Sequence, residues 1–283
     1  MLNRQKTLLQ FLKAAGRPVL RTELTKWSFL LRHEYTSNGG SAFYDFVPYQ
    51  LGPFSFALYQ EIGKLEERGY VIRDNEKSWT ADQNVSFPSP DSAVQRDVSR
   101  IVRRFGDWDN EKLLDYVYEA WPGYTVNSKR KQLAQRATTE PAIFTAGYEG
   151  LSVDAFLNLL VEKGVRRLID VRRNAIARRY GFHRSTLQRL TGSLDIDYVH
   201  VPELGIHSDL RQNLETMNDR NTLFEKYEKT TLSTNDEALE RVALLMKEKP
   251  SVLVCMEAEA ICCHRSRVAK VIAERTSLPI QNL

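Results

Sequence analysis

The chain has 283 residues, of which 42% are hydrophobic and 27% charged, the balance of an ordinary globular protein with room for about two domains. Its net charge of +4 is too small to identify a polyanionic partner by itself. No apolar run approaches the roughly 18 residues that cross a bilayer, the first residues lack a signal-peptide pattern, and the three cysteines lie between Cys255 and Cys263, without a disulfide framework. We therefore expect a cytoplasmic protein that contacts no membrane.

The first 85 residues predict helices followed by a short hairpin. Helical spacing of apolar residues around 8–12, 22–31 and 55–68 is followed by extended segments at 70–73 and 78–80. This layout resembles a winged helix, and Gly-Pro-Phe at 52–54 also resembles the Panacea-type antitoxin domains. The resemblance implies a nucleic-acid-binding domain over 1–85, since winged helices commonly place a helix in the major groove. A protein-interaction module is the alternative.

Residues 86–140 predict a linker and a small helical extension. Prolines and serines at 86–92 indicate the linker. Helices are expected over 93–105 and 111–120, and a third over the basic stretch 128–136. The arginines and lysines here suit either solvated helix faces or nucleic-acid contacts, and the sequence leaves both open.

Residues 141–283 alternate between strand and helix patterns. We expect strands at 142–146, 166–171, 196–201, 251–256 and 278–280, with helices at 152–164, 183–190, 236–247 and 263–275. This alternation predicts a Rossmann-like three-layer domain with a mostly parallel sheet. The polar excursion 202–229 is either a lid over the site or a disordered loop.

Five short motifs occur in order through this half. They are Gly147-Tyr148-Glu149-Gly150, Asp170-Val171-Arg172, Tyr198-Val199-His200, Pro202-Glu203-Leu204-Gly205, and Cys255-Met256-Glu257 with Cys263-His264-Arg265. Together they resemble family 488 of the domains of unknown function, over residues of about 143–275. The extra Cys262 and the pair Asn174-Ala175, where proline is common in the family, are mild departures. The resemblance implies no particular activity.

Each motif follows a predicted strand. In a parallel sheet the carboxyl ends of neighbouring strands meet at one edge, where open α/β sheets bind their ligands. We therefore predict that Asp170, Glu257 and Glu149 are catalytic carboxylates at this edge. The alternative for each is a carboxylate that caps a helix or forms a salt bridge.

Residues around these carboxylates suit an anionic, phosphate-bearing substrate. Cys263 at the start of a helix is either a nucleophile or a buried thiol beside a phosphate-binding Arg265. Zinc is disfavoured because the cysteines lack paired Cys-x-x-Cys spacing; clustered carboxylates leave a magnesium site open, but we predict no metal and no cofactor. The predicted substrate-binding residues are Tyr148, Arg172, Arg173, Arg178, Arg179, Tyr180, His200, Glu203, Cys263, His264 and Arg265.

Carboxylates, arginines and aromatics are the parts needed to cleave the bond between a base and its sugar. A carboxylate stabilises the oxocarbenium-like state or activates water, arginines hold flanking phosphates, and an aromatic holds a flipped base. The sequence thus predicts a DNA glycosylase acting on duplex DNA, possibly on a modified base, in genome defence or repair. A metal-dependent nuclease and a non-enzymatic DNA-binding regulator are the alternatives.

Overall fold

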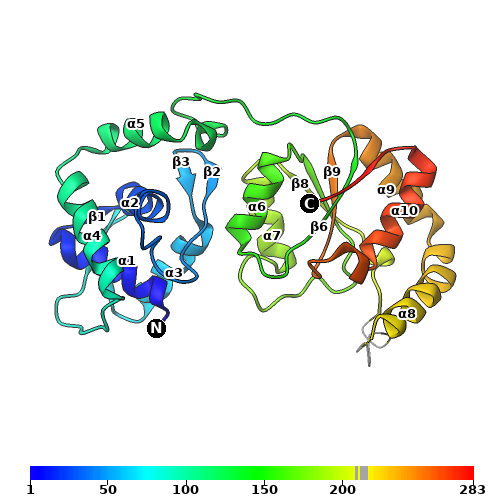
Figure 1. Cartoon of the computed structure of the whole chain (residues 1–283), viewed down its shortest axis with the longest axis horizontal. Coiled ribbons are helices and arrows are strands. Elements are labelled where there is room, and N and C mark those ends of the chain that lie inside the picture. The colour runs from blue at the N-terminus through cyan, green and yellow to red at the C-terminus, as the bar shows by residue number, and fades with distance from the viewer. Residues whose placement is uncertain (208–209, 211–215) are drawn as a thin grey trace. The chain divides into compact units, whose positions relative to one another are not determined.

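The chain forms two compact units, Met1–Arg136 and Ala137–Leu283. The computed structural model describes residues 1–207, 210 and 216–283, and Figure 1 shows its helices and strands. Within these residues, no helix combines the length and the apolar character that crossing a membrane requires. Each unit has its own hydrophobic core.

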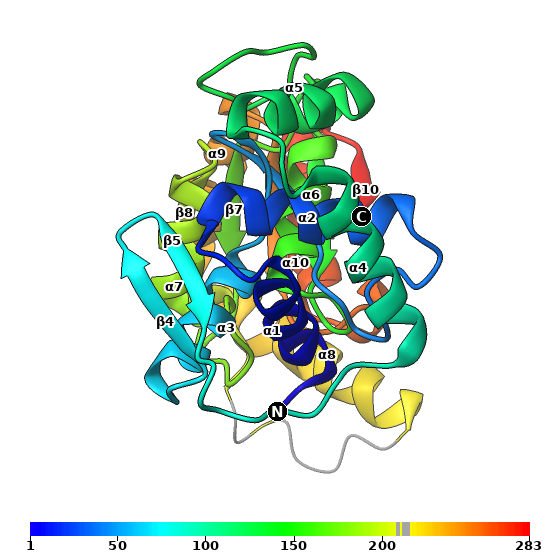
Figure 2. The ribbon, with the colours of Figure 1, turned by 90° about the vertical axis from the view of Figure 1, so that its left-hand side faces the viewer.

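The first unit combines helices with a three-stranded sheet in the order β1-β5-β4, whose neighbours pair antiparallel. Figure 2 shows its strands β4 and β5 in cyan. The expected hairpin at 70–80 is present as β4 and β5. A second, two-stranded hairpin, β2 with β3, precedes the third helix. The elements are α1 (Asn3–Ala15), β1 (Val19–Leu20), α2 (Arg21–Glu34), β2 (Val47–Tyr49), β3 (Gly52–Phe54), α3 (Phe56–Glu67), β4 (Val71–Asn75), β5 (Ser78–Ala81), α4 (Ser92–Phe105) and α5 (Asn110–Ala120).

Helices α4 and α5 belong to the core of the first unit. Val98, Ile101 and Phe105 of α4 and Val117 of α5 are fully buried in the same cluster as the apolar residues of α1 and α2. Burial of such side chains contributes about 1.5–3 kcal/mol each. Residues 86–140, predicted from the sequence as a linker and helical extension, thus include two helices that pack into the core of the first unit.

The helix expected over 128–136 is absent, and that prediction was wrong. A 3-10 turn, Pro122–Thr125, ends α5, and no helix follows it before residue 137. The Thr125 hydroxyl accepts hydrogen bonds from the backbone of Leu133 and Ala134, and the backbone N–H of Lys129 donates to Gln50. These partners take the backbone groups that helical i→i−4 bonds would need.

The second unit is a five-stranded sheet in the order β10-β6-β9-β7-β8, in which every neighbouring pair is parallel. Helices flank it, as expected of a Rossmann-like layout. Its elements are β6 (Ile143–Gly147), α6 (Val153–Glu162), β7 (Arg167–Asp170), α7 (Arg184–Gly192), β8 (Asp197–His200), α8 (Met217–Thr230), α9 (Asp236–Glu248), β9 (Ser251–Cys255), α10 (Arg265–Thr276) and β10 (Ile280–Asn282), with 3-10 turns at Pro202–Leu204, Leu232–Thr234 and Ala260–Cys262.

The central strands β7 and β9 are buried on both faces, and their interior positions are apolar. The buried charges of β7, Arg167 and Asp170, lie at its two ends. All residues of β7 and β9 are buried. Helices α6 and α7 lie on one side of the sheet, and α9 and α10 lie on the other (Figure 1). The side chain of Ser152 begins α6 by accepting from the backbone N–H of Ala155 at 3.0 Å.

Part of the polar excursion is a regular helix. Of the two alternatives for 202–229, a lid or a disordered loop, the second does not hold for Met217–Thr230, where α8 packs through Leu223, Phe224 and Tyr227. Three apolar side chains in a largely polar segment gave a weak signal for a helix. The rest of the expectation falls partly on 208–209 and 211–215, which lie outside the described residues.

Lys26 in α2 is a buried amine in the first unit. Its Nζ donates to the carbonyl oxygen of Pro53 at 2.8 Å and lies beside a cavity of about 110 Å³. Burial lowers the pKa of Lys26 from 10.5 to about 7, because an ammonium loses its hydration inside the protein. The folded protein therefore releases this proton at a much lower pH than the unfolded chain.

We predict that Lys26→Met stabilises the first unit most below about pH 7, and that this gain falls as pH rises toward 10.5. Below about pH 7 the folded wild type holds a buried ammonium, which lowers its free energy of unfolding. Between about pH 7 and 10.5, Lys26 is neutral in the folded state and charged in the unfolded state. The free energy of unfolding of the wild type therefore rises with pH in this range. Urea unfolding followed by tryptophan fluorescence measures this, since all four tryptophans lie before residue 137. Exposed Lys64→Met is the control, and a gain independent of pH would contradict the prediction.

Candidate functional site

The carboxyl ends of four strands lie at one edge of the parallel sheet. Gly147 at the end of β6 pairs with Cys255 at the end of β9, and Asp170 at the end of β7 pairs with His200 at the end of β8. β7 and β9 are also neighbours. The structure thus brings the predicted motifs to one edge, but it places their side chains in very different environments.

Asp170 is sealed inside this edge. Its side chain is fully buried, and Arg172 holds it in a two-pronged ion pair with Nε to Oδ1 at 2.8 Å and Nη2 to Oδ2 at 2.5 Å. The hydroxyl of Tyr198 donates to Oδ2 at 2.6 Å. Both carboxylate oxygens are occupied, so the structure does not support the expectation that Asp170 touches a substrate.

Arg172 and Tyr148 are also buried, and both form hydrogen bonds inside the protein. Arg172 also donates from Nη1 to the Tyr148 hydroxyl at 2.8 Å and to the carbonyl of Phe182 at 2.9 Å. The Tyr148 ring is stacked on Phe182 with centroids 4.1 Å apart. In this structure Phe182 covers the Tyr148 ring and the Arg172 guanidinium is buried, so both side chains face protein groups. Burial, and then the charge of Asp170, raise the pKa of Tyr198, which stays a hydrogen-bond donor.

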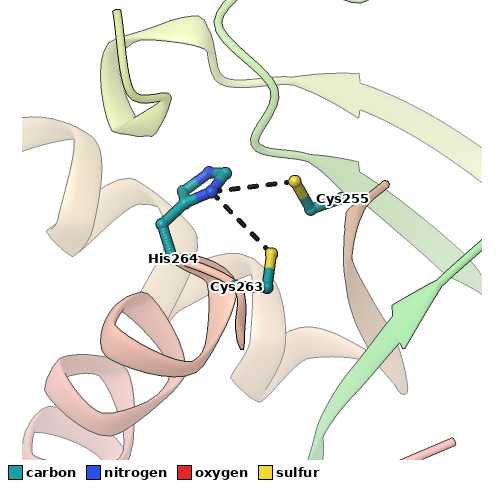
Figure 3. Close-up of side chains that lie close together, drawn as sticks. All are labelled: Cys255, Cys263 and His264. Carbon is teal, nitrogen blue, oxygen red and sulfur yellow. Dashed lines mark hydrogen bonds between the residues drawn. The ribbon is translucent and has the colours of Figure 1, made fainter. Parts of the chain in front are cut away.

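Cys255, Cys263 and His264 form a compact buried cluster (Figure 3). The two sulfurs lie 3.7 and 3.8 Å from His264 Nδ1. Oε2 of Glu257 lies 3.0 Å from Cys255 Sγ and 3.1 Å from Cys263 Sγ. Three side chains of the types that bind soft or borderline metal ions thus converge at the end of β9, and the Glu257 carboxylate contacts both sulfurs.

A hydrogen bond to β7 orients the His264 ring. Nε2 donates to the carbonyl oxygen of Val171 at 3.0 Å, and since a carbonyl only accepts, Nε2 carries the proton. In a neutral ring this leaves the lone pair of Nδ1 directed at the sulfurs. The two thiols titrate as a pair: the hydrogen bond from Cys263 lowers the pKa of Cys255, and burial together with the neighbouring Cys255 raises that of Cys263.

Arg265 supports the loop that carries Glu257. It is buried and donates from Nη1 to the carbonyl of Glu257 and from Nη2 to that of Ala258 at 2.8 Å. A Cβ on Gly147 would come within 1.8 Å of the same Glu257 carbonyl oxygen, so only glycine fits there. The expectation that Arg265 binds phosphate is not supported, because its side chain faces protein carbonyls.

The exposed polar groups at this edge lie on neighbouring loops. Oε2 of exposed Glu149 accepts from the backbone N–H of Ala258 at 3.1 Å. Arg179, also exposed, donates to the carbonyl of Gly150 at 3.4 Å. Glu149 therefore lies between the loop of Glu257 and the arginine-rich loop that follows β7.

The remaining predicted ligands have mixed surroundings. Arg178 is exposed, and Arg173 and Tyr180 are half-buried, with Arg173 donating to the carbonyl of Pro202 at 3.4 Å. His200 Nε2 donates to the carbonyl of Arg172 at 2.9 Å, and Glu203 pairs with Arg241 at 3.3 Å. The hydrogen bond of His200 and the ion pair of Glu203 thus hold loops at the sheet edge in place.

The convergence at Cys255 was not predicted from the sequence, because the cysteines lack paired Cys-x-x-Cys spacing. Instead, Cys255 ends a strand, and Cys263 and His264 lie at the start of the following helix. The usable signal was positional: a thiol at a strand end and a Cys-His pair at the next helix both lie at the ligand-binding edge of such a sheet.

Comparison with known proteins agrees with the family resemblance. The family described as domain of unknown function DUF488 matches residues 152–272. The matched residues lie in the second unit, here named the DUF488 domain after this match. No curated protein and no solved structure matches the chain. The DUF488 match spans α6 to α10 and so includes Asp170, Arg172 and the whole Cys255–His264 cluster.

We predict that removing one partner of the buried Asp170–Arg172 pair destabilises the DUF488 domain by about 3–5 kcal/mol, because the other charge stays buried and uncompensated. Arg172→Met and Asp170→Asn test this. Tyr198→Phe, which deletes one hydrogen bond, is expected to cost about 1–3 kcal/mol.

Unfolding followed by far-ultraviolet circular dichroism measures these losses, and tryptophan fluorescence identifies any transition that belongs to the first unit. Exposed Arg178→Gln is the control, with an expected change within about 0.5 kcal/mol. Equal stability of Arg172→Met and this control would show that the buried pair does not hold the domain together.

Proposed function

We propose that this protein is a DNA-directed N-glycosidase whose DUF488 domain removes a base, possibly a modified one, and leaves an abasic site. The observation that carries the proposal is the exposed carboxylate of Glu149, held by the backbone of Ala258 next to Glu257 and beside the loop of Arg178 and Arg179. Glycosidic cleavage needs a carboxylate facing the sugar and cations facing its phosphates.

We assign different roles to the three predicted catalytic carboxylates, because they differ in exposure to solvent. Asp170 is a positioning residue, since Arg172 and Tyr198 occupy it fully. Glu257 is half-buried and directs one oxygen at two sulfurs. Of the three predicted catalytic carboxylates, Glu149 is the exposed one, and we assign it to water activation or to stabilisation of the oxocarbenium-like state.

The aromatic residue that we propose to stack on the base is Tyr180 in place of Tyr148. Tyr148 and Phe182 are buried against each other, so half-buried Tyr180, in the middle of the arginine-rich loop, is the ring that we assign to the flipped base. Arg178 and Arg179 precede it directly in sequence, and arginines interleaved with aromatics are typical of nucleic-acid-binding segments.

The first unit is proposed to bind the duplex. Its order of α1, β1, α2, the β2–β3 hairpin, α3, β4 and β5, with the sheet order β1-β5-β4, supports a winged-helix interpretation. Its third helix carries Glu66 and Glu67 near Lys64, a poor charge balance for a groove lined with phosphates. Helix α4 suits phosphates better, because Arg96, Arg100 and Arg103 are exposed at i, i+4 and i+7 on one face.

We predict that the protein, in the presence of EDTA, converts an end-labelled duplex with a normal, damaged, hydroxymethylated or glucosylated base into a product that breaks only after hot alkali. Glu149→Gln is expected to slow this excision about 100-fold or more. Exposed Glu162→Gln, at the far end of α6 near the amino ends of the strands, is the matched control.

The outcomes separate the alternatives. Direct strand breaks that require added magnesium would replace the glycosidase with a metal-dependent nuclease. Full excision by Glu149→Gln would refute the role of Glu149. Binding without any product from the whole set of bases would favour a DNA-binding regulator.

A second prediction concerns α4. Replacing Arg96 and Arg103 by Gln is expected to weaken duplex binding on all sequences and to flatten the slope of log affinity against log salt by about 0.9 for each phosphate that the variant no longer neutralises. Fluorescence anisotropy across a salt series measures the slope. Exposed Lys247→Gln in α9 is the charge control, and equal slopes for both variants would remove α4 from the DNA interface.

A further inference from the structure

Cys255, Cys263 and His264 direct their sulfur and nitrogen atoms at one another inside the protein. Their ligand atoms all lie within 4.8 Å of one another, and all three side chains are buried. They come from two elements, the end of β9 and the start of α10. We propose that they bind one zinc ion, with Glu257 as the fourth ligand. The inference does not rest on the proposed function.

The distances fit a tetrahedral zinc site. Zinc binds sulfur at about 2.3 Å and nitrogen at about 2.1 Å, so tetrahedral angles place a sulfur and a nitrogen roughly 3.6 Å apart. The structure has 3.7 and 3.8 Å between His264 Nδ1 and the two sulfurs. Oε2 of Glu257 lies 3.0 and 3.1 Å from the sulfurs, but it falls outside the group of ligand atoms within 4.8 Å of one another. Its side chain would therefore have to turn toward His264 to complete the tetrahedron.

The surroundings of His264 are those of a metal ligand. Metal-binding histidines almost always donate their second ring N–H to a carbonyl or carboxylate, which fixes the tautomer and the ring direction. His264 Nε2 donates to the Val171 carbonyl, and Nδ1 faces the sulfurs. This hydrogen bond is independent of the cysteines, and it prepares the ring to bind an ion.

The donor set identifies the metal. Two sulfurs, one imidazole and one carboxylate suit zinc, whereas magnesium requires oxygen ligands and water. A cavity of about 30 Å³, lined in part by Glu257, Cys262 and His264, leaves room for about one water molecule beside the cluster. The buried guanidinium of Arg265, held on the Glu257 carbonyl, lies close enough to offset part of the ligands' negative charge.

A zinc ion here would brace the loop between β9 and α10. This loop carries Glu257 and Ala258, and the backbone of Ala258 holds Glu149. Four protein ligands close the coordination sphere, which is typical of structural zinc. The metal would thereby fix the position of the exposed carboxylate without touching a substrate.

The test measures metal content of the full chain. Wild type and Cys262→Ser are incubated with zinc, dialysed and analysed by inductively coupled plasma mass spectrometry, with about one zinc per chain expected in both. Cys262 is the matched control because it neighbours Cys263 yet lies outside the cluster. Cys263→Ser and His264→Gln are expected to bind on the order of 10- to 100-fold more weakly, the loss that even outer-shell changes cause.

Cobalt substitution keeps the test decisive if a variant fails to fold. Wild-type protein loaded with cobalt is expected to show thiolate-to-cobalt absorption and the visible bands of tetrahedral cobalt. Glu257→Gln should retain the thiolate absorption and shift the visible bands, and identical bands would remove Glu257 from the ligand set. Wild type without zinc and without thiolate-to-cobalt absorption, or a Cys255–Cys263 disulfide in its place, would overturn the site. None of these measurements involves nucleic acid, so the result is independent of base excision.

Discussion

The edge of the parallel sheet depends on one buried ion pair. A carboxylate with no solvent contact is costly unless its charge is balanced and its lone pairs are used. Arg172 does both for Asp170, and its remaining donors reach the hydroxyl of Tyr148 and the carbonyl of Phe182. Tyr198 adds a bond from β8. The loops after β6 and β7 and the end of β8 are thus fixed to a single guanidinium–carboxylate pair.

This pair divides the arginine cluster into two groups. Arg172 is an interior residue, whereas Arg178 and Arg179, a few positions later, are exposed. Arg265 behaves like Arg172, because it is buried and satisfies backbone carbonyls of the Glu257 loop. Two of the family motifs therefore contribute arginines that build the site. In the loop between Arg172 and α7, the arginines reach solvent, as the proposed binding of phosphates requires.

The strand and helix pattern of the second unit was predictable because it follows from local spacing of apolar residues. The meeting of Gly147, Asp170, His200 and Cys255 at one edge followed from the parallel topology. What the sequence could not supply is which polar groups face inward. Asp170 and Glu149 both follow strands, yet Asp170 is fully buried and Glu149 is exposed. That difference arises from side chains elsewhere in the fold, above all Tyr198 and Arg172.

The cluster of Cys255, Cys263 and His264 could not be predicted from the sequence for the same reason, because it depends on contacts between elements. Spacing along the chain shows that Cys263 and His264 are adjacent, but only the return of α10 to the end of β9 places Cys255 opposite them. The carbonyl that orients His264 belongs to Val171, the residue after Asp170. The buried ion pair and the cluster thus share the end of β7. A change that displaces this strand end would alter the direction of His264 Nδ1, so the two groups are expected to be coupled in stability.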